Sequence, residues 1–155
     1  MKLSFVLNGK PVNQDVRANV SLVELLRTKG CWSVRQGCET GDCGSCAVIV
    51  NGRARNACIM LAMQVEGKTI ETYENLDKMT DMKVLKEALM NVVDLECGYC
   101  LPGMLMSLKA LVDRIPDPTE EEIAEAVTGN SCRCVQPIRP VEVIMEALQK
   151  IQGKW

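Results

Sequence analysis

The sequence predicts an α+β protein in which short strands come first and helices follow. Two observations support this fold class. Residues 2–73 hold short apolar runs joined by Asn-Gly turns, a pattern that is typical of paired strands. Residues 82–153 lack that alternation, and their apolar residues recur at helical spacing between proline and glycine breaks. We therefore expect one domain over residues 1–76 and a helical domain over residues 77–155.

The first half should form a small sheet around one main helix. A hairpin is expected where Asn8-Gly9 joins two strand-like runs, residues 2–7 and 11–16. Ser21 and Glu24 have the spacing of a capping box, which predicts a helix over residues 22–29. A strand, its returning partner, a short helix and a last strand are expected over residues 47–50, 53–57, 58–65 and 69–73. This combination fits a β-grasp, ferredoxin-like domain.

The second half should form four helices with short connections, which suggests a four-helix bundle. The expected linker to this half is residues 75–81. Thr119 and Glu122 repeat the capping-box spacing, and Gly129 is the expected end of that helix. Pro102 and Pro140 occupy positions typical of the first helical turn. The four predicted helices cover residues 82–93, 103–114, 120–128 and 141–152.

The composition excludes several kinds of function. The net charge of −2 gives no sign of a nucleic-acid surface. The apolar runs are too short to cross a membrane, and Met1 leads directly into a strand-like run rather than an export signal, so we expect a cytoplasmic protein. Nine cysteines in a reducing compartment indicate metal binding or catalysis more than disulfides. The absence of histidine removes Cys-His nucleophiles, His-containing zinc sites and Rieske ligation.

Four cysteines of the first half have the spacing of a plant-type [2Fe–2S] ferredoxin, C-x4-C-x2-C followed by a distant fourth. These predicted ligands are Cys38, Cys43, Cys46 and Cys58. Gly37, Gly41 and Gly44 lie among them, and their lack of side chains would let backbone N–H groups approach the sulfurs. Zinc is the main alternative, but zinc sites usually pair short C-x2-4-C units. The spacing therefore favours an iron–sulfur cluster.

A second set of four cysteines follows in the helical half, as a C-x2-C pair and a C-x-C pair. Its members are Cys97, Cys100, Cys132 and Cys134. Alone, this set also fits a four-cysteine zinc site, or a thioredoxin-like pair at Cys97 and Cys100. The first set favours a second [2Fe–2S] cluster, because a partner cluster would give electrons a destination. The ninth cysteine, Cys31, fits neither pattern and should be buried and inert.

The combined pattern C-x4-C-x2-C-x11-C, C-x2-C and G-N-x-C-R-C resembles the small iron–sulfur subunit of the molybdenum hydroxylases, the xanthine dehydrogenase group. The resemblance covers nearly the whole chain. It is carried chiefly by the stretches Ser33–Cys38, Gly41–Cys46, Cys97–Gly103 and Gly129–Cys134. It implies a β-grasp ferredoxin-like domain followed by a four-helix [2Fe–2S]-binding domain.

The resemblance also implies partners. These are a large subunit that binds the molybdopterin cofactor and usually a medium subunit that binds FAD. Electrons would pass from molybdenum through the helical-domain cluster and the ferredoxin-domain cluster to flavin, with no catalytic residue on this chain. Glu96 and Cys134 would be the pterin contacts. Glu96 stands where the family commonly has Gln, and Val135-Gln136-Pro137 stands where it usually has Thr-Gly-Tyr.

Two other functions are compatible with the same cysteines. A free-standing two-cluster ferredoxin would carry electrons without a fixed partner. A zinc-stabilised interaction module would have no redox role and no visible colour.

Overall fold

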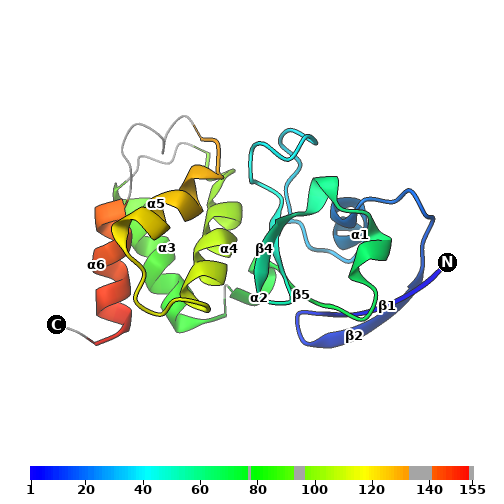
Figure 1. Ribbon diagram of the computed structural model, residues 1–155, viewed down its shortest axis with the longest axis horizontal. Helices are drawn as coiled ribbons and strands as arrows, with labels where there is room; N and C mark the ends of the chain where they lie inside the picture. Colours follow the sequence, from blue (N-terminus) through cyan, green and yellow to red (C-terminus); the bar gives the residue numbers. More distant parts are fainter. Residues whose placement is uncertain (77, 93–96, 133–140, 154–155) are drawn as a thin grey trace.

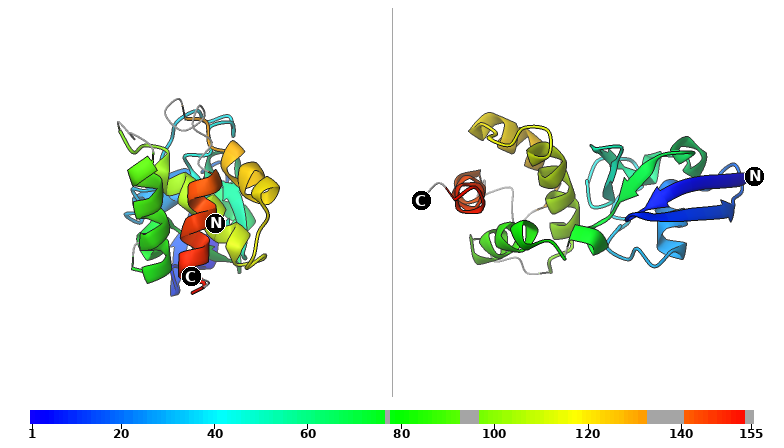
Figure 2. Two further views of the ribbon diagram at one scale, coloured as in Figure 1. Left: turned by 90° about the vertical axis from the view of Figure 1, so that its left-hand side faces the viewer. Right: turned by 90° about the horizontal axis from the view of Figure 1, so that it is seen from below.

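The computed structural model describes residues 1–76, 78–92, 97–132 and 141–153. A sheet occupies one end of the molecule, and most of the helices occupy the other (Figures 1 and 2). The α+β class predicted from the sequence is therefore confirmed. No helix in the described ranges is long and apolar enough to cross a membrane.

The sheet has five strands in the order β2-β1-β5-β3-β4. Strand β1 pairs with β5 in parallel, and the other neighbours are antiparallel. The two expected hairpins are present, and Asn8, Gly9, Asn51 and Gly52 all have the positive φ that tight hairpin turns require. The strands are β1 (Lys2–Leu7), β2 (Lys10–Asp15), β3 (Ala47–Val50), β4 (Arg53–Asn56) and β5 (Thr69–Glu71).

Helix α1 (Leu22–Thr28) covers one face of the sheet, and its capping box is formed by Ser21 and Glu24 as predicted. The prediction of a single short helix over residues 58–65 was wrong. Two 3₁₀ segments, η1 (Ala57–Ile59) and η2 (Ala62–Val65), stand there instead. The residues between them are extended because the Met60 carbonyl accepts from the Leu22 N–H at 2.7 Å and Leu61 pairs with Ser21.

The last strand ends earlier than expected, and the chain turns into helix α2 (Tyr73–Leu76), which the sequence did not predict. Glu74 fixes this turn, because its carboxylate accepts hydrogen bonds from the Ser33 N–H at 2.8 Å and from the Thr72 hydroxyl at 2.6 Å. The expected linker over residues 75–81 was also wrong, since α2 occupies its start and the next helix begins at Thr80.

Four longer helices follow: α3 (Thr80–Val92), α4 (Leu101–Val112), α5 (Glu120–Thr128) and α6 (Val141–Ile151). Cys100 is the N-cap of α4, and Pro102 lies in its first turn. Thr119 and Glu122 form the expected capping box on α5, and Gly129 is its C-cap. Pro140 lies outside the described residues.

Strand β3 joins the two hydrophobic cores. Val48 and Val50 belong to the core beneath α1, whereas Ala47 and Ile49 belong to the core of the helices. All four β3 side chains are buried, because α4 lies between the second face of the sheet and helices α3 and α6 (Figures 1 and 2). The sheet is thus covered on both faces near β3, and the two halves of the chain pack as neighbours.

We predict that Glu74→Gln lowers the free energy of unfolding at neutral pH by about 1–2 kcal/mol, the lower part of the range for hydrogen bonds to a charged group, because Glu74 is only partly buried. Burial acts to raise the pKa of Glu74, but hydrogen bonds from Thr72 and Ser33 outweigh it and lower the pKa. A carboxyl with a lowered folded-state pKa stabilises the fold above its unfolded pKa and loses that effect as pH falls through the folded value.

Chemical denaturation at neutral and acidic pH checks this prediction, with the exposed Glu87→Gln as control. The difference between wild type and Glu74→Gln should shrink toward acid. A difference that stays constant across pH, or an equal loss in Glu87→Gln, would contradict it.

Candidate metal centres

The first predicted ligand set lies in the long segment between α1 and β3 and within η1. Its four thiols gather as two pairs. The Cys43 N–H donates to the Cys38 sulfur at 3.3 Å, and the thiols of Cys46 and Cys58 contact each other. Among the described residues, no three side chains of cysteine or carboxylate type converge as a single metal ion would need. Two thiol pairs suit a two-iron cluster, in which four thiolates hold two irons.

The two pairs differ in electrostatic environment. Hydrogen bonds from the Thr40 side chain and from the Cys43 and Thr40 backbone lower the pKa of Cys38 to about 6. Burial, with the neighbouring thiols of Cys46 and Cys38, raises the pKa of Cys58 to about 12. The donors around Cys38 therefore favour the anionic form of its sulfur, whereas burial beside two other thiols disfavours that form at Cys58.

A side chain at each glycine of this loop would meet a different neighbour. A Cβ on Gly37 would lie 2.8 Å from the Cys43 sulfur, so a side chain there would press on a predicted ligand. Gly41 has φ +88°, and a Cβ would meet Ile59 at 3.1 Å. Gly44 has φ +68°, and its Cβ would lie 2.3 Å from the Gly129 carbonyl oxygen at the end of α5. Gly37 adjoins a predicted ligand sulfur, and the Gly41 backbone N–H donates to the Cys58 sulfur, as the sequence suggested for both.

Three members of the second set lie within the described residues. Cys97 and Cys100 precede α4, and Cys132 follows α5. Burial and contact with the Cys132 thiol raise the pKa of Cys100 to about 12, with Cys97 also nearby. The fourth predicted ligand, Cys134, lies outside the described residues. So do the predicted pterin contact Glu96 and the stretch Val135-Gln136-Pro137.

Arg35 and Tyr99 fasten the two cysteine segments to each other. The Arg35 guanidinium donates to the Gly98 carbonyl at 3.1 Å and lies 4.9 Å above the centre of the Tyr99 ring. The Tyr99 hydroxyl donates to the Gln36 carbonyl at 2.8 Å. Gln36 comes two residues before Cys38, and Tyr99 lies between Cys97 and Cys100. The two candidate centres are therefore close neighbours.

Comparison with known proteins agrees with this arrangement. Residues 12–95 match the family described as the 2Fe-2S iron-sulfur cluster binding domain, and residues 69–145 match the [2Fe-2S] binding domain. The nicotinate dehydrogenase small FeS subunit of Eubacterium barkeri is 39% identical over 145 residues, which cover 93% of this chain and 92% of that subunit. The chain belongs to the small [2Fe–2S] subunits of the molybdenum hydroxylase family.

Solved structures of this family have the same fold. The quinoline 2-oxidoreductase structure from Pseudomonas putida 86 contains a chain that is 32% identical, with a TM-score of 0.86 over 99% of this chain and 96% of that one. The aldehyde oxidoreductase from Desulfovibrio gigas is 30% identical, with a TM-score of 0.88 over the whole of this chain but only 18% of that longer one.

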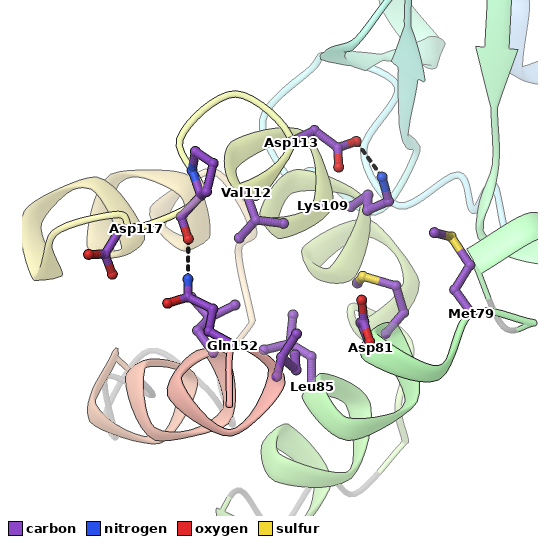
Figure 3. A pocket seen from close by; sticks show the side chains of 12 residues that line it. Met79, Asp81, Leu85, Lys109, Val112, Asp113, Asp117 and Gln152 are labelled. Carbon is purple, nitrogen blue, oxygen red and sulfur yellow. Dashed lines mark hydrogen bonds and ion pairs between the residues drawn. The ribbon is translucent and has the colours of Figure 1, made fainter. Parts of the chain in front are cut away.

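A mainly apolar pocket of about 370 Å³ lies between α3, α4 and α6 (Figure 3). Lys109 and Asp113 form an ion pair at its rim, and Gln152 donates to the Pro116 carbonyl. The pocket adjoins the C-terminal end of α4, whereas Cys97 and Cys100 precede the N-terminal end. It is therefore separate from both candidate metal centres.

For several residues around these centres, no role was predicted from the sequence. They are Arg35 and Tyr99, which join the two segments, Thr40 beside Cys38, and Asn56, whose side chain donates to the Gly41 carbonyl at 2.6 Å. Tyr99 carried a signal that could have been used, because it is one of only two tyrosines and lies between two predicted ligands. Cys31 is 4% exposed, and the expectation that it is buried is confirmed.

We predict that Cys58→Ala lowers the iron content of the purified protein from about four to about two atoms per chain, because a [2Fe–2S] cluster needs four thiolates. Cys31→Ala is the matched control, since it removes a thiol from the same half of the chain without touching either set. Iron and acid-labile sulfide analysis measures the result. Full iron in Cys58→Ala would exclude Cys58 as a ligand, and an equal loss in Cys31→Ala would show that the loss is not specific to the predicted set.

Proposed function

We propose that this chain is the electron-transfer subunit of a molybdenum hydroxylase complex and holds two [2Fe–2S] clusters. Cys38, Cys43, Cys46 and Cys58 would hold the first cluster, and Cys97, Cys100, Cys132 and Cys134 the second. The observation that carries the proposal is one thiol pair in contact in each set, Cys46 with Cys58 and Cys100 with Cys132, in two segments that are hydrogen-bonded to each other. The donor set is chemically suited, because it contains thiols and no histidine.

The clusters would supply one-electron oxidation and reduction, and the chain's own groups would set their environment. Amide and hydroxyl donors at Thr40 and Cys43 point to the Cys38 sulfur and would favour its anionic form. Burial of Cys46 and Cys100, 1% and 5% exposed, would keep water from those sulfurs. No general base or nucleophile is assigned to this chain, since the oxidation of substrate would take place on a partner.

We propose two partners, a large subunit that binds the molybdopterin cofactor and a medium subunit that binds FAD. The support is that relatives of similar length are themselves named as small or iron–sulfur-binding subunits, including those of nicotinate and xanthine dehydrogenases. Electrons would leave molybdenum, cross this chain and reach flavin. These names also disfavour a free-standing ferredoxin. Glu96 and Cys134 remain the proposed contacts to the pterin.

We also propose that the chain comprises two domains, a ferredoxin-like β-grasp domain over residues 1–76 and a four-helix [2Fe–2S]-binding domain over residues 77–155. The boundary is supported by two separate hydrophobic cores, one formed mainly by residues before it and one mainly by residues after it. Ala47, Ile49 and Leu76 are exceptions, because they belong to the core of the helices. A cytoplasmic location is proposed because a chain that commits its cysteines to metal suits a reducing compartment.

We predict that Cys46→Ser in the complex blocks the reduction of flavin by substrate and leaves the reduction of molybdenum by substrate intact. The reason is that Cys46 belongs to the cluster assigned to the flavin side of the path. Rapid mixing of the complex with substrate, followed by EPR for molybdenum and absorbance for flavin, separates the two half-reactions. Equal loss of both half-reactions would refute this division of labour.

A further inference from the structure

Strand β4 forms one of the two edges of the sheet, and this edge is open. The strand order places β4 last, with β3 as its neighbour. Backbone groups along an antiparallel strand point alternately toward the neighbour and away from it. The Ala57 N–H donates to the Cys46 carbonyl at 3.3 Å, so the backbone groups of Arg53 and Arg55 also point toward β3. The N–H and C=O of Ala54 therefore point outward, where no backbone group of the described residues is bonded to them.

The opposite edge of the sheet, strand β2, is blocked. The Val16 N–H donates to the Met1 carbonyl at 2.9 Å, so the same alternation turns the backbone groups of Pro11 and Asn13 outward. Proline has no N–H to offer, and a proline on an edge strand is one of the ways in which sheets avoid further pairing. Strand β4 contains no proline, so its outward groups remain available to another strand.

Strand β4 also carries positive charge that nothing balances within the described residues. Arg53 and Arg55 are exposed, and because they alternate along the strand they lie on the same face of the sheet. Neither forms an ion pair with a residue that the structure describes. Lys68 adds a third cation beside the strand. These charges repel a second copy of the same edge and favour a segment that carries carboxylates.

Two hollows run along β4. One, of about 480 Å³, lies between β4 and helices α4 and α5. The other, of about 550 Å³, lies between β4, α4 and the 3₁₀ segments, and the 62% exposed Ile59 lines it. Ala54, Arg55 and Ser107 line both hollows, so the two adjoin along the strand. We call strand β4 together with these two hollows the β4 groove.

We propose that strand β4 accepts an extended, acidic segment of the large molybdopterin-binding subunit as a sixth strand of the sheet. The inference rests on the proposed function, which supplies that partner. In such strand addition, backbone hydrogen bonds bind an extended segment, and the side chains beside them select which segment it is. The N–H and C=O of Ala54 would bond to the added strand, and Arg53 and Arg55 would select its carboxylates.

The walls of the β4 groove favour the large subunit over the flavin-binding one. The first hollow is bounded by α4 and α5. Cys100 is the N-cap of α4, and Cys132 follows the end of α5, so these helices position ligands proposed for the second cluster. That cluster is the one assigned to the molybdenum side of the path. A large subunit seated on these two helices has the β4 groove beside it.

The charges around the β4 groove define the segment further. Side chains directly opposite each other on paired strands lie on the same face. The residues of the added strand opposite Arg53 and Arg55 should therefore be Asp or Glu, separated by one residue. That middle residue shares the face of Ala54 and should be small, because this face lies toward α4. Arg114, on the far wall, stands beside acidic residues of α5, so the demand for carboxylates is confined to the β4 side.

Ala54→Pro and Asn13→Pro form a matched pair of variants. Each removes one outward N–H from an edge strand and leaves the inward hydrogen bonds of the sheet in place. Ala54→Pro acts on the open edge, whereas Asn13→Pro acts on the edge that Pro11 already blocks. The two variants therefore differ mainly in whether the proposed sixth strand loses a donor.

The variants are tested in the complex, by co-expression with the large and medium subunits. Iron content and circular dichroism show first that each variant chain is folded and loaded, and dissociation of the complex on dilution then measures affinity. We expect Ala54→Pro to weaken binding to the large subunit about tenfold, since it leaves one buried acceptor without its donor. Asn13→Pro should bind like wild type. Wild-type affinity in a folded Ala54→Pro would overturn the proposal.

Hydrogen exchange in the wild-type complex tests the same edge without any substitution, should Ala54→Pro fail to fold. Exchange of the peptide that covers residues 53–56 should slow severalfold on assembly with the large subunit, because outward N–H groups become bonded. Residues 11–15, on the blocked edge, should exchange as in the free chain. Unchanged exchange at residues 53–56 would overturn the proposal.

Reversal of charge tests the acidic character of the segment. Arg53→Glu combined with Arg55→Glu should weaken binding severalfold, and the effect should shrink at high salt. Lys2→Glu combined with Lys10→Glu makes the same change of charge near the other edge and should leave binding unchanged. Equal effects of the two double variants would overturn the acidic assignment. A wild-type chain that co-purifies with no molybdopterin-binding subunit would instead refute the proposed function.

Discussion

The pairing of thiols within an irregular loop is the constraint on which the rest of the structure depends. Residues 29–46 form neither helix nor strand, which is unusual for so long a segment inside a compact domain. Its end is nevertheless buried, from Gly44 through Cys46. Side-chain packing alone would not dictate this course. The need for four sulfurs to reach one bound group would explain the course of the loop.

The surrounding fold positions that loop from two sides. Strand β3 begins directly after Cys46, and its two faces contribute to both hydrophobic cores. Helix α4 packs against β3, and its N-cap is Cys100. The same strand–helix contact therefore carries one predicted ligand from each set. Burial of apolar side chains, the dominant stabilising term in folding, is in this way coupled to the spacing of the two candidate centres.

Much of this could be predicted from local sequence rules. The Asn-Gly turns fixed both hairpins, and the pairs Ser21/Glu24 and Thr119/Glu122 marked the starts of α1 and α5, because each signal acts within a few residues. The thiol sets were predictable for the same reason, since most ligands are close in sequence. The segments around Met60 and Glu74 were not, because their partners, Leu22 and Ser33, lie far away along the chain.

The contact between the two centres was equally beyond local reasoning. Gly44 was expected to serve its own cluster, whereas its close neighbours are Gly129 and Asn130. Nothing in the sequence around Gly44 signals a helix end that comes over eighty residues later. Arg35 and Tyr99 illustrate the same limit, since each lies in a recognisable motif and only the fold shows that the two motifs touch.

The most direct test of the central claim is to measure iron and acid-labile sulfide in the purified protein and to record EPR spectra after chemical reduction. Two clusters predict about four irons and four sulfides per chain, with two distinct signals of one unpaired electron each. A colourless protein that contains zinc, or one with no bound metal, would contradict the account.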